Sequence, residues 1–204
     1  MPAVPPRRID GATYKTPGFN APLRRGKWDL TEGGIRVPLI AIGPSIEADS
    51  QCNTPVIGYD LLPTFLDLVG SQTLLGDEFD GASLAPLLHD PAVKEVQRPL
   101  PNTLIFHFPH YNRFGLKAPH TAIRQGAYKL LYFHDRQQSL LFDVESDPGE
   151  KQDLCSAMPS RARNMTATLQ AYLRQVKAEK PQDSITWGTG INRAGASNFV
   201  ESFR

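Results

Sequence analysis

Four short β-type runs at hairpin spacing, followed by one amphipathic segment, constrain the fold of this chain more than any other feature. The runs are Thr103–Phe108, Thr121–Arg124, Tyr128–Phe133 and Ser139–Val144. Runs of this length and spacing favour a small antiparallel sheet. After a turn signal at 147–150, apolar residues recur every three or four positions from Met158 to Val176, so we expect a helix that lies on the sheet.

The first half of the chain has a different pattern. Val37–Ile42 is a continuous apolar run between two glycine-containing turns, which suits a strand buried on both faces of a parallel sheet. A helix is expected from Leu61 to Val69, with Asp60 as its N-cap and Gly70 as its stop. Apolar residues surround most of that helix, so it should be buried. Such a strand and helix indicate an α/β fold.

We therefore expect four parts along the chain. They are an irregular arm at 1–22, an α/β portion at 23–100, a small α+β portion at 101–180 and a tail at 181–204. A structured protein rarely begins with such an arm, so we expect further sequence before Met1 in the parent protein. The apolar run would then lack most of its neighbouring strands here, and an unpaired apolar edge predicts poor solubility.

Charge and composition exclude several classes of partner. Lys and Arg total 22 against 21 Asp and Glu, so a net charge of +1 gives no reason to expect nucleic acid or an anionic membrane surface. No apolar stretch approaches the roughly 18 residues of a membrane span, and the start holds no run of signal-peptide length. The two cysteines stand far apart, so the sequence predicts no disulfide framework and no zinc site.

Residues 23–38 hold the densest set of chemically useful side chains. The segment carries four cations, Arg24, Arg25, Lys27 and Arg36. Gly26 and the pair at 33–34 allow backbone conformations that could hold Lys27 at a defined point, where its ammonium would suit a compact oxyanion. The alternative is a solvated basic loop in which Glu32 and Arg36 form a local ion pair, and charge runs more often face water.

The order of these features resembles the sulfatase family, whose fold is similar to alkaline phosphatase. Arg25-Gly26-Lys27 followed by 32–38 is similar to the family's lysine segment. The later landmarks are Thr54-Pro55-Val56, Asp60, Leu66–Gly70, Asp80–Leu84, Ala122-Ile123-Arg124, Gly126–Leu130, Leu141-Phe142-Asp143 and Asp147–Glu150. The resemblance covers roughly Ala21 to Lys177 and identifies the C-terminal portion of an arylsulfatase-like protein.

The resemblance implies roles for several residues. Lys27 would contact the sulfate group, and Glu32 and Arg36 would shape the turn around it. His107 and His110 would touch the organic part of the substrate, although they are also compatible with a strand end that carries partly exposed imidazoles. A metal site at the two histidines is not supported, because no third ligand lies nearby in the sequence.

In the intact parent protein the resemblance further implies a calcium ion and a formylglycine nucleophile made from a Cys/Ser-x-Pro-x-Arg motif. Cys52 and Cys155 do not fit that motif, and no calcium ligand can be assigned in this chain. We therefore expect a fragment of a sulfuric ester hydrolase that is inactive alone, acting in the parent on a sulfated small molecule or glycan.

Two alternatives remain open at this stage. One is a non-catalytic binding or structural module, and the other is a phosphoester or phosphonate hydrolase of the same superfamily. The natural substrate, the oligomeric state and the location are not encoded here, and export of the parent protein is one option.

Overall fold

The computed structural model of this 204-residue chain describes residues 7–9, 12–14, 20–71, 79–111, 116 and 118–181. The contacts divide the chain into two compact units. Unit 1 comprises Met1–Arg36 and Ile105–Arg204, and unit 2 comprises Val37–Leu104. Residues 23–36, which the sequence assigned to the α/β portion, thus lie in unit 1 with the C-terminal sheet.

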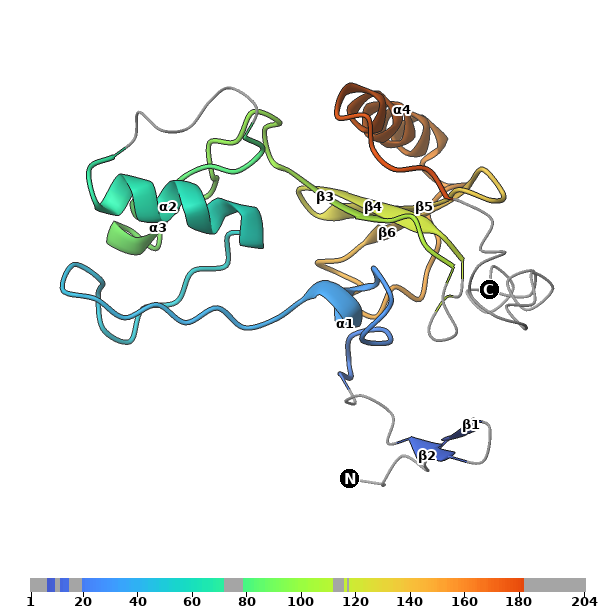
Figure 1. The fold of residues 1–204 in the computed structure, drawn as a ribbon, viewed down its shortest axis with the longest axis horizontal. Coiled ribbons are helices and arrows are strands. Elements are labelled where there is room, and N and C mark those ends of the chain that lie inside the picture. Colours follow the sequence, from blue (N-terminus) through green and yellow to red (C-terminus); the bar gives the residue numbers. More distant parts are fainter. Residues whose placement is uncertain are drawn as a thin grey trace. The chain divides into compact units, whose positions relative to one another are not determined.

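The predicted antiparallel sheet is confirmed. Its strands are β3 (Thr103–Phe108), β4 (His120–Gln125), β5 (Tyr128–Phe133) and β6 (Gln138–Asp143), in the order β3-β4-β5-β6. The central strand β5 pairs antiparallel with both β4 and β6 (Figure 1). Gly126, at a φ of 58°, lies in the two-residue turn between β4 and β5, where a left-handed conformation matches the twist of the strands.

The predicted amphipathic helix is also confirmed, as α4 (Pro159–Gln175). Figure 1 shows α4 lying across one face of the sheet. Three strands each contribute an apolar residue to this contact, and α4 contributes Ala162, Met165 and Leu169 to the same cluster, which also contains Ile123, Leu130 and Leu141. The recurrence of apolar residues every three or four positions is therefore explained by a single buried face.

The opposite face of the sheet carries a second apolar cluster. It contains Ala122, Leu131, Phe133, Leu140 and Phe142, with Leu30 packed against it. Successive residues of a strand point to opposite faces, so the odd-numbered residues of β5 face away from α4. The segment 20–36, which includes the short helix α1 (Glu32–Ile35), lies on this second face (Figure 1).

The N-terminal arm differs from its predicted irregular structure. Two three-residue strands, β1 (Arg7–Ile9) and β2 (Ala12–Tyr14), pair antiparallel, with Arg8 opposite Thr13. Three alternating residues are too few for a periodic pattern to be recognised in the sequence, which is why the hairpin was not predicted.

Unit 2 contains the 3-10 turn η1 (Gly58–Asp60) and the helices α2 (Leu61–Leu68) and α3 (Ala85–His89). The helix expected from Leu61 is confirmed, and Gly70 follows it at a φ of 69°. Asp60 occupies the predicted N-cap position of α2, but its side chain makes no capping hydrogen bond to the helix. Its buried carboxylate instead accepts hydrogen bonds from Arg98 Nε at 2.8 Å and Arg98 Nη2 at 2.5 Å.

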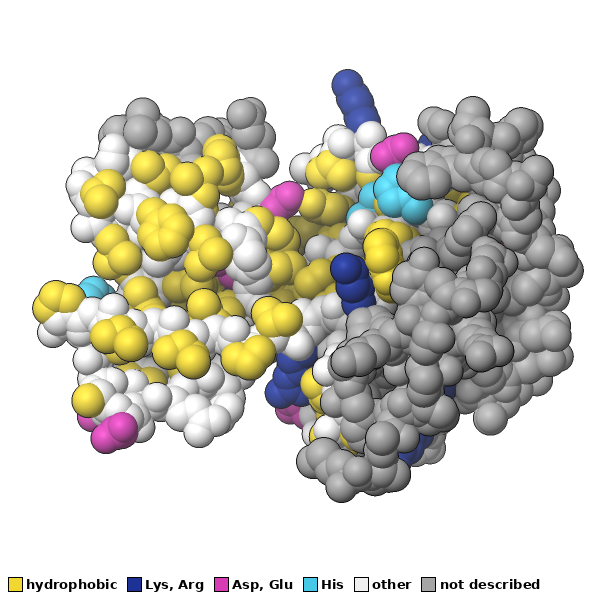
Figure 2. All heavy atoms as spheres, turned by 60° about the horizontal axis from the view of Figure 1, so that its bottom comes forward, with side chains coloured by type: hydrophobic (Ala, Val, Ile, Leu, Met, Phe, Trp, Pro, Cys, Tyr) yellow, Lys and Arg dark blue, Asp and Glu magenta, His cyan; other side chains and the backbone are white. Residues whose placement is uncertain are grey.

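Two predictions for unit 2 are wrong, namely the strand at 37–42 and the burial of helix α2. Residues 37–42 form no strand, and Val37, Ile40 and Ile42 are 79%, 83% and 95% exposed. Helix α2 also leaves much of its apolar surface exposed, with Phe65 at 59%. Figure 2 shows hydrophobic side chains spread over this surface. A strand needs partners, and none of the strands in the described residues pairs with 37–42.

Candidate functional site

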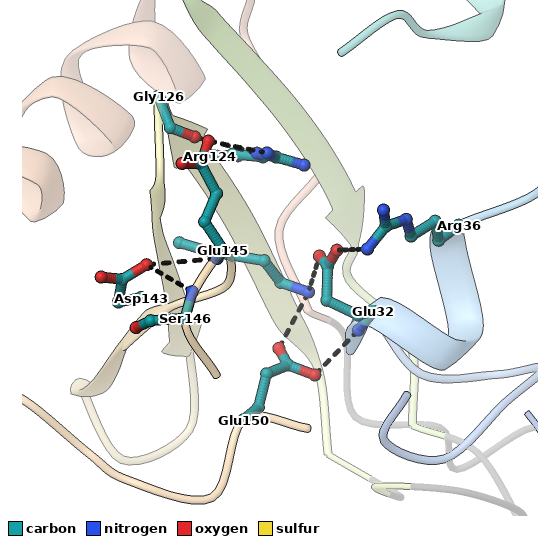
Figure 3. Close-up of polar contacts among 9 residues, drawn as sticks. Glu32, Arg36, Arg124, Gly126, Asp143, Glu145, Ser146 and Glu150 are labelled. Carbon is teal, nitrogen blue, oxygen red and sulfur yellow. Dashed lines mark hydrogen bonds and ion pairs between the residues drawn. The ribbon is translucent and has the colours of Figure 1, made fainter. Parts of the chain in front are cut away.

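A buried three-residue ion cluster joins the segment 20–36 to the sheet. The ammonium nitrogen of Lys129, on β5, lies 2.9 Å from a carboxylate oxygen of Glu32 and 2.9 Å from one of Glu150. All three side chains are at most 2% exposed. The backbone N–H of Glu32 also donates to Glu150 Oε2 at 2.8 Å. Figure 3 shows the side chains of Glu32 and Glu150 converging, with Arg36 beyond Glu32. The guanidinium of Arg36 lies 3.8 Å from the carboxylate of Glu32.

The electrostatics of this cluster depend on Lys129. Burial raises the pKa of Glu150 above its usual value, and the ammonium of Lys129 opposes that rise. Glu150 Oε1 accepts no hydrogen bond of good geometry, so the burial of this oxygen is compensated by its ion pair with Lys129. Two buried carboxylates therefore share one buried cation, and Arg36, 56% exposed in its side chain, adds a weaker and more screened contact.

Three further contacts fasten the same segment to the rest of unit 1. Arg24 Nη1 donates to the backbone carbonyl of Glu150 at 2.5 Å. The buried carboxylate of Asp29 accepts from the N–H of Leu116 at 2.5 Å, and burial raises the pKa of Asp29. The N–H of Leu30 donates to His120 Nε2 at 3.1 Å.

His120 is held in one tautomer by these contacts. Because its Nε2 accepts from Leu30, its Nδ1 carries the proton and donates to the carbonyl of Ala118 at 2.7 Å. Burial lowers the pKa of His120 to about 4, so the ring is neutral at physiological pH. The imidazole acts as a structural anchor beneath the segment.

The backbone of the segment is tightly constrained. A Cβ on Gly34 would lie 1.9 Å from the carbonyl oxygen of Asp29, so only glycine fits there. Arg25 and Trp28 have φ values of 59° and 83°, a conformation that bulky side chains seldom adopt. These two residues lie on either side of Lys27, which is therefore presented by a loop of defined shape.

The four cations of the segment have different partners. Arg24 donates to Glu150, the guanidinium of Arg25 lies 3.8 Å from Asp29, and that of Arg36 lies 3.8 Å from Glu32. Lys27 is exposed, and within the part of the chain that the structure describes no carboxylate lies within 4.0 Å of its ammonium. Its ammonium instead lies 4.9 Å from the centre of the Trp28 ring. Lys27 is thus the cation of this segment best placed to bind an anion.

The two predicted histidines lie in different environments. Both ring nitrogens of His107 are engaged, one with Thr121 Oγ1 at 2.7 Å and the other with the carbonyl of Glu179 at 2.8 Å. His134 also contacts Thr121 Oγ1, and burial lowers the pKa of His134 to about 4. His110 is exposed, with its ring edge-on to Phe108. Among the described residues, no hydrogen bond or ion pair joins either predicted histidine to Lys27.

Sequence reasoning missed Lys129 and Glu150 as the partners of Glu32. A signal for Lys129 was present, because it shares its side of a β-type run with Leu131 and Phe133, and a lysine on an apolar face needs a buried counter-charge. Glu150 was assigned only to a turn, and nothing local in the sequence connects it with Glu32.

The described residues do not fit the calcium ion or the nucleophile of the resembled family. Nowhere among them do three His, Cys, Asp or Glu side chains gather as metal ligands would. Cys52 is exposed, and Cys155 donates its thiol to the carbonyl of Ser139 at 3.3 Å, with its pKa raised to about 12 by burial. The described helices also include none with the length and apolarity to cross a bilayer.

Comparisons with known proteins identify relatives of this chain. A family model described as "N-sulphoglucosamine sulphohydrolase, C-terminal" matches residues 26–179. A sulfatase of Formosa agariphila is 30% identical over 178 residues, covering 80% of this chain and 32% of the relative. Arylsulfatase K of Gallus gallus is 29% identical over 188 residues, covering 87% and 34%. The chain therefore spans about one third of the length of these relatives.

Solved structures show the same fold. The structure of Ps i-CgsB in complex with k-i-k-neocarrahexaose matches with a TM-score of 0.59 and 23% identity, covering 90% of this chain and 37% of that one. BT4656 in complex with its substrate D-glucosamine-2-N,6-O-disulfate matches with a TM-score of 0.55 and 22% identity, covering 69% and 28%. The predicted fold class is confirmed, with its small antiparallel sheet and C-terminal helix. This chain belongs to the sulfatase family and corresponds to the C-terminal portion of that family's fold.

Proposed function

We propose that the parent protein of this chain hydrolyses sulfate esters and that Lys27 contacts the sulfate group of its substrate. The observation that carries the proposal is the position of Lys27. Three of the four cations in its segment are paired with carboxylates or a carbonyl, whereas Lys27 is exposed and has no carboxylate partner among the described residues.

The way in which the segment is fastened suits this role. An ammonium that is already in place can stabilise charge developing on a sulfate ester without reorganisation at the moment of reaction. In bulk water such a contact would contribute only about 1 kcal/mol, and it would contribute more in a site from which water is excluded. The cluster of Glu32, Lys129 and Glu150 supplies the rigidity, because it ties the segment to β5 through buried charges.

We propose that the calcium ion and the formylglycine nucleophile come from a part of the parent protein outside the described residues, which do not fit either group. These groups would supply the metal-assisted and nucleophilic chemistry. The contribution of this chain would be to bind and orient the sulfate, so we expect the 204-residue chain alone to give no turnover.

We propose a sulfated carbohydrate as the substrate class. Support comes from the two proteins of similar fold, which are named with a disulfated glucosamine and with a neocarrahexaose. His107 and His110 stay candidates for contacts with the organic part of the substrate. His110 is the more accessible of the two, because its ring is exposed while both ring nitrogens of His107 are engaged.

The test uses a sulfatase polypeptide in which this chain forms the C-terminal part. Lys27→Met should lower kcat for 4-nitrophenyl sulfate by about 10²-fold or more, the effect of removing one group that stabilises transition-state charge. Lys151→Met, at an exposed lysine, is the matched control and should leave kcat unchanged. Wild-type turnover by Lys27→Met, or preference for 4-nitrophenyl phosphate over the sulfate, would contradict the proposal.

The second candidate is a non-catalytic module that binds a sulfated sugar through Lys27. It is favoured by one observation, the lack of a fitting nucleophile or metal cluster among the described residues. The reading frame upstream of Met1 distinguishes the candidates. In-frame codons for a Cys-x-Pro-x-Arg motif would support the hydrolase. A functional promoter and ribosome-binding site directly before Met1 would support the non-catalytic module.

A further inference from the structure

Trp28 follows Lys27 directly and combines three unusual properties. Its φ of 83° lies in the left-handed region, its side chain is 41% exposed, and its ring centre lies 4.9 Å from the ammonium of Lys27. A tryptophan in this backbone conformation persists only where the surrounding structure enforces it, and such positions cluster at functional sites.

The surrounding contacts explain why Trp28 cannot relax inward. The next residue, Asp29, is buried, and its carboxylate accepts from the N–H of Leu116 while its own N–H donates to the carbonyl of Gly26 at 3.2 Å. Rotating Trp28 to an ordinary backbone conformation would disrupt these two hydrogen bonds of Asp29. The fold therefore holds an indole ring at the surface, beside the exposed cation.

We propose that Trp28 is a positioning residue that holds the ammonium of Lys27 over its indole face and so sets the affinity of Lys27 for sulfate. A cation within about 6 Å of a tryptophan ring centre is attracted to the ring face. This inference rests on the proposed function only in taking sulfate as the anion; the contact between the two side chains is independent of it.

The choice of an aromatic partner has a physical consequence. A carboxylate beside Lys27 would position the ammonium but would also neutralise it, and would compete with an incoming anion. The indole restrains the ammonium and leaves its net charge unchanged. Arg25 and Arg36 show the other arrangement, since each lies 3.8 Å from a carboxylate of the same segment.

The first experiment measures the contact itself by NMR of the 204-residue chain. Protons that lie over an aromatic ring are shifted upfield, so the ε-methylene signal of Lys27 should lie upfield of those of exposed lysines such as Lys151. Trp28→Phe should keep most of the shift, and Trp28→Ala and Trp28→Leu should abolish it. Trp187→Phe removes the other tryptophan of the chain and should leave the shift unchanged.

The second experiment titrates sodium sulfate against the same Lys27 signal at constant ionic strength, with sodium chloride as the control salt. We expect Trp28→Ala and Trp28→Leu to weaken sulfate binding about two- to fivefold, the range given by cation–π attraction at an exposed site. Trp28→Phe should restore most of the loss. Backbone amide spectra that overlay outside 23–38 establish that the variants are folded.

Three results would overturn the inference. The first is a Lys27 signal at the same position in the wild type and in both non-aromatic variants. The second is equal sulfate affinity in all variants. The third comes from the same titration with a sulfated monosaccharide: a loss of affinity for the monosaccharide with inorganic sulfate unaffected would mean that Trp28 contacts the sugar itself. A wild-type upfield shift with no response to sulfate would refute the sulfate contact of Lys27 while leaving its placement over Trp28 established.

Discussion

Replacing Lys129 by methionine should destabilise unit 1 severely. The lysine side chain is 0% exposed, and its ammonium lies 2.9 Å from each of two carboxylates that are themselves at most 2% exposed. Methionine fills a similar volume but leaves Glu32 and Glu150 buried without their shared cation, while Arg36 stays 3.8 Å away and largely in solvent. Breaking a buried ion pair in this way costs about 3–5 kcal/mol, a large part of the roughly 5–15 kcal/mol that stabilises a typical domain.

The assay is urea unfolding of the 204-residue chain at pH 7, followed by circular dichroism, with near-ultraviolet spectra to establish native packing. Lys151→Met is the matched control, since Lys151 is exposed, and it should change the unfolding free energy by less than about 0.5 kcal/mol. Adding Glu32→Gln and Glu150→Gln to Lys129→Met should recover much of the loss, because the uncompensated charges are then gone.

The pH dependence provides a second check on the same variant. Lys129→Met removes the charge that chiefly opposes the burial-driven rise in the pKa of Glu150, so the unfolded state releases that proton more readily than the folded state. The destabilisation should therefore be greatest at neutral pH and should shrink as the pH falls toward 5. A loss below about 1 kcal/mol at pH 7, or one that is equal at pH 5 and pH 7, would refute this account of the cluster.

Three other predictions follow from residues described above. Burial lowers the pKa of His120 from 6.5 to about 4, so the folded state gains stability that is complete above pH 6.5 and is lost as the pH falls toward 4. The lost stability amounts to up to about 3 kcal/mol, and the unfolding free energy of His120→Gln in urea should vary less with pH over this range. Gly34→Ala would place a Cβ 1.9 Å from the carbonyl oxygen of Asp29 and should cost about 2 kcal/mol or more in thermal unfolding, whereas Gly58→Ala, with open space around it, should be within about 0.5 kcal/mol of wild type. Ile40→Lys, at a side chain that is 83% exposed, should reduce self-association in sedimentation velocity, and unchanged association would show that the apolar run does not cause it.

Local patterns in the sequence predicted the four-stranded sheet and helix α4 well. The strands β4, β5 and β6 are joined by short hairpins, so each pairing partner lies a few residues away and the alternation of side chains is visible directly. Helix α4 was predicted because Ala162, Met165 and Leu169 follow one another at helical spacing and share one buried face.

Two of the failures, the strand at 37–42 and the partners of Glu32, share a physical cause, which is dependence on distant residues. The apolar run at 37–42 shows what surroundings it would prefer, but not whether neighbouring strands are present, and the structure leaves Ile42 95% exposed. The Glu32–Lys129 pair joins residues 97 apart, and the Glu32–Glu150 contact joins residues 118 apart. Separations of this kind leave no periodic trace in a single sequence.

The contacts that fasten residues 20–36 to the sheet have a consequence for protein engineering. A chimaera that exchanged only residues 20–36 between two sulfatases would pair a donor Glu32 with a recipient Lys129 and Glu150. A residue at any of these positions that broke an ion pair would leave a buried charge without its partner. Strand β5, the turn at 147–150 and residues 20–36 should therefore be transplanted together as one cassette. Libraries aimed at new substrates can instead vary the exposed positions around Lys27 and leave this cassette intact.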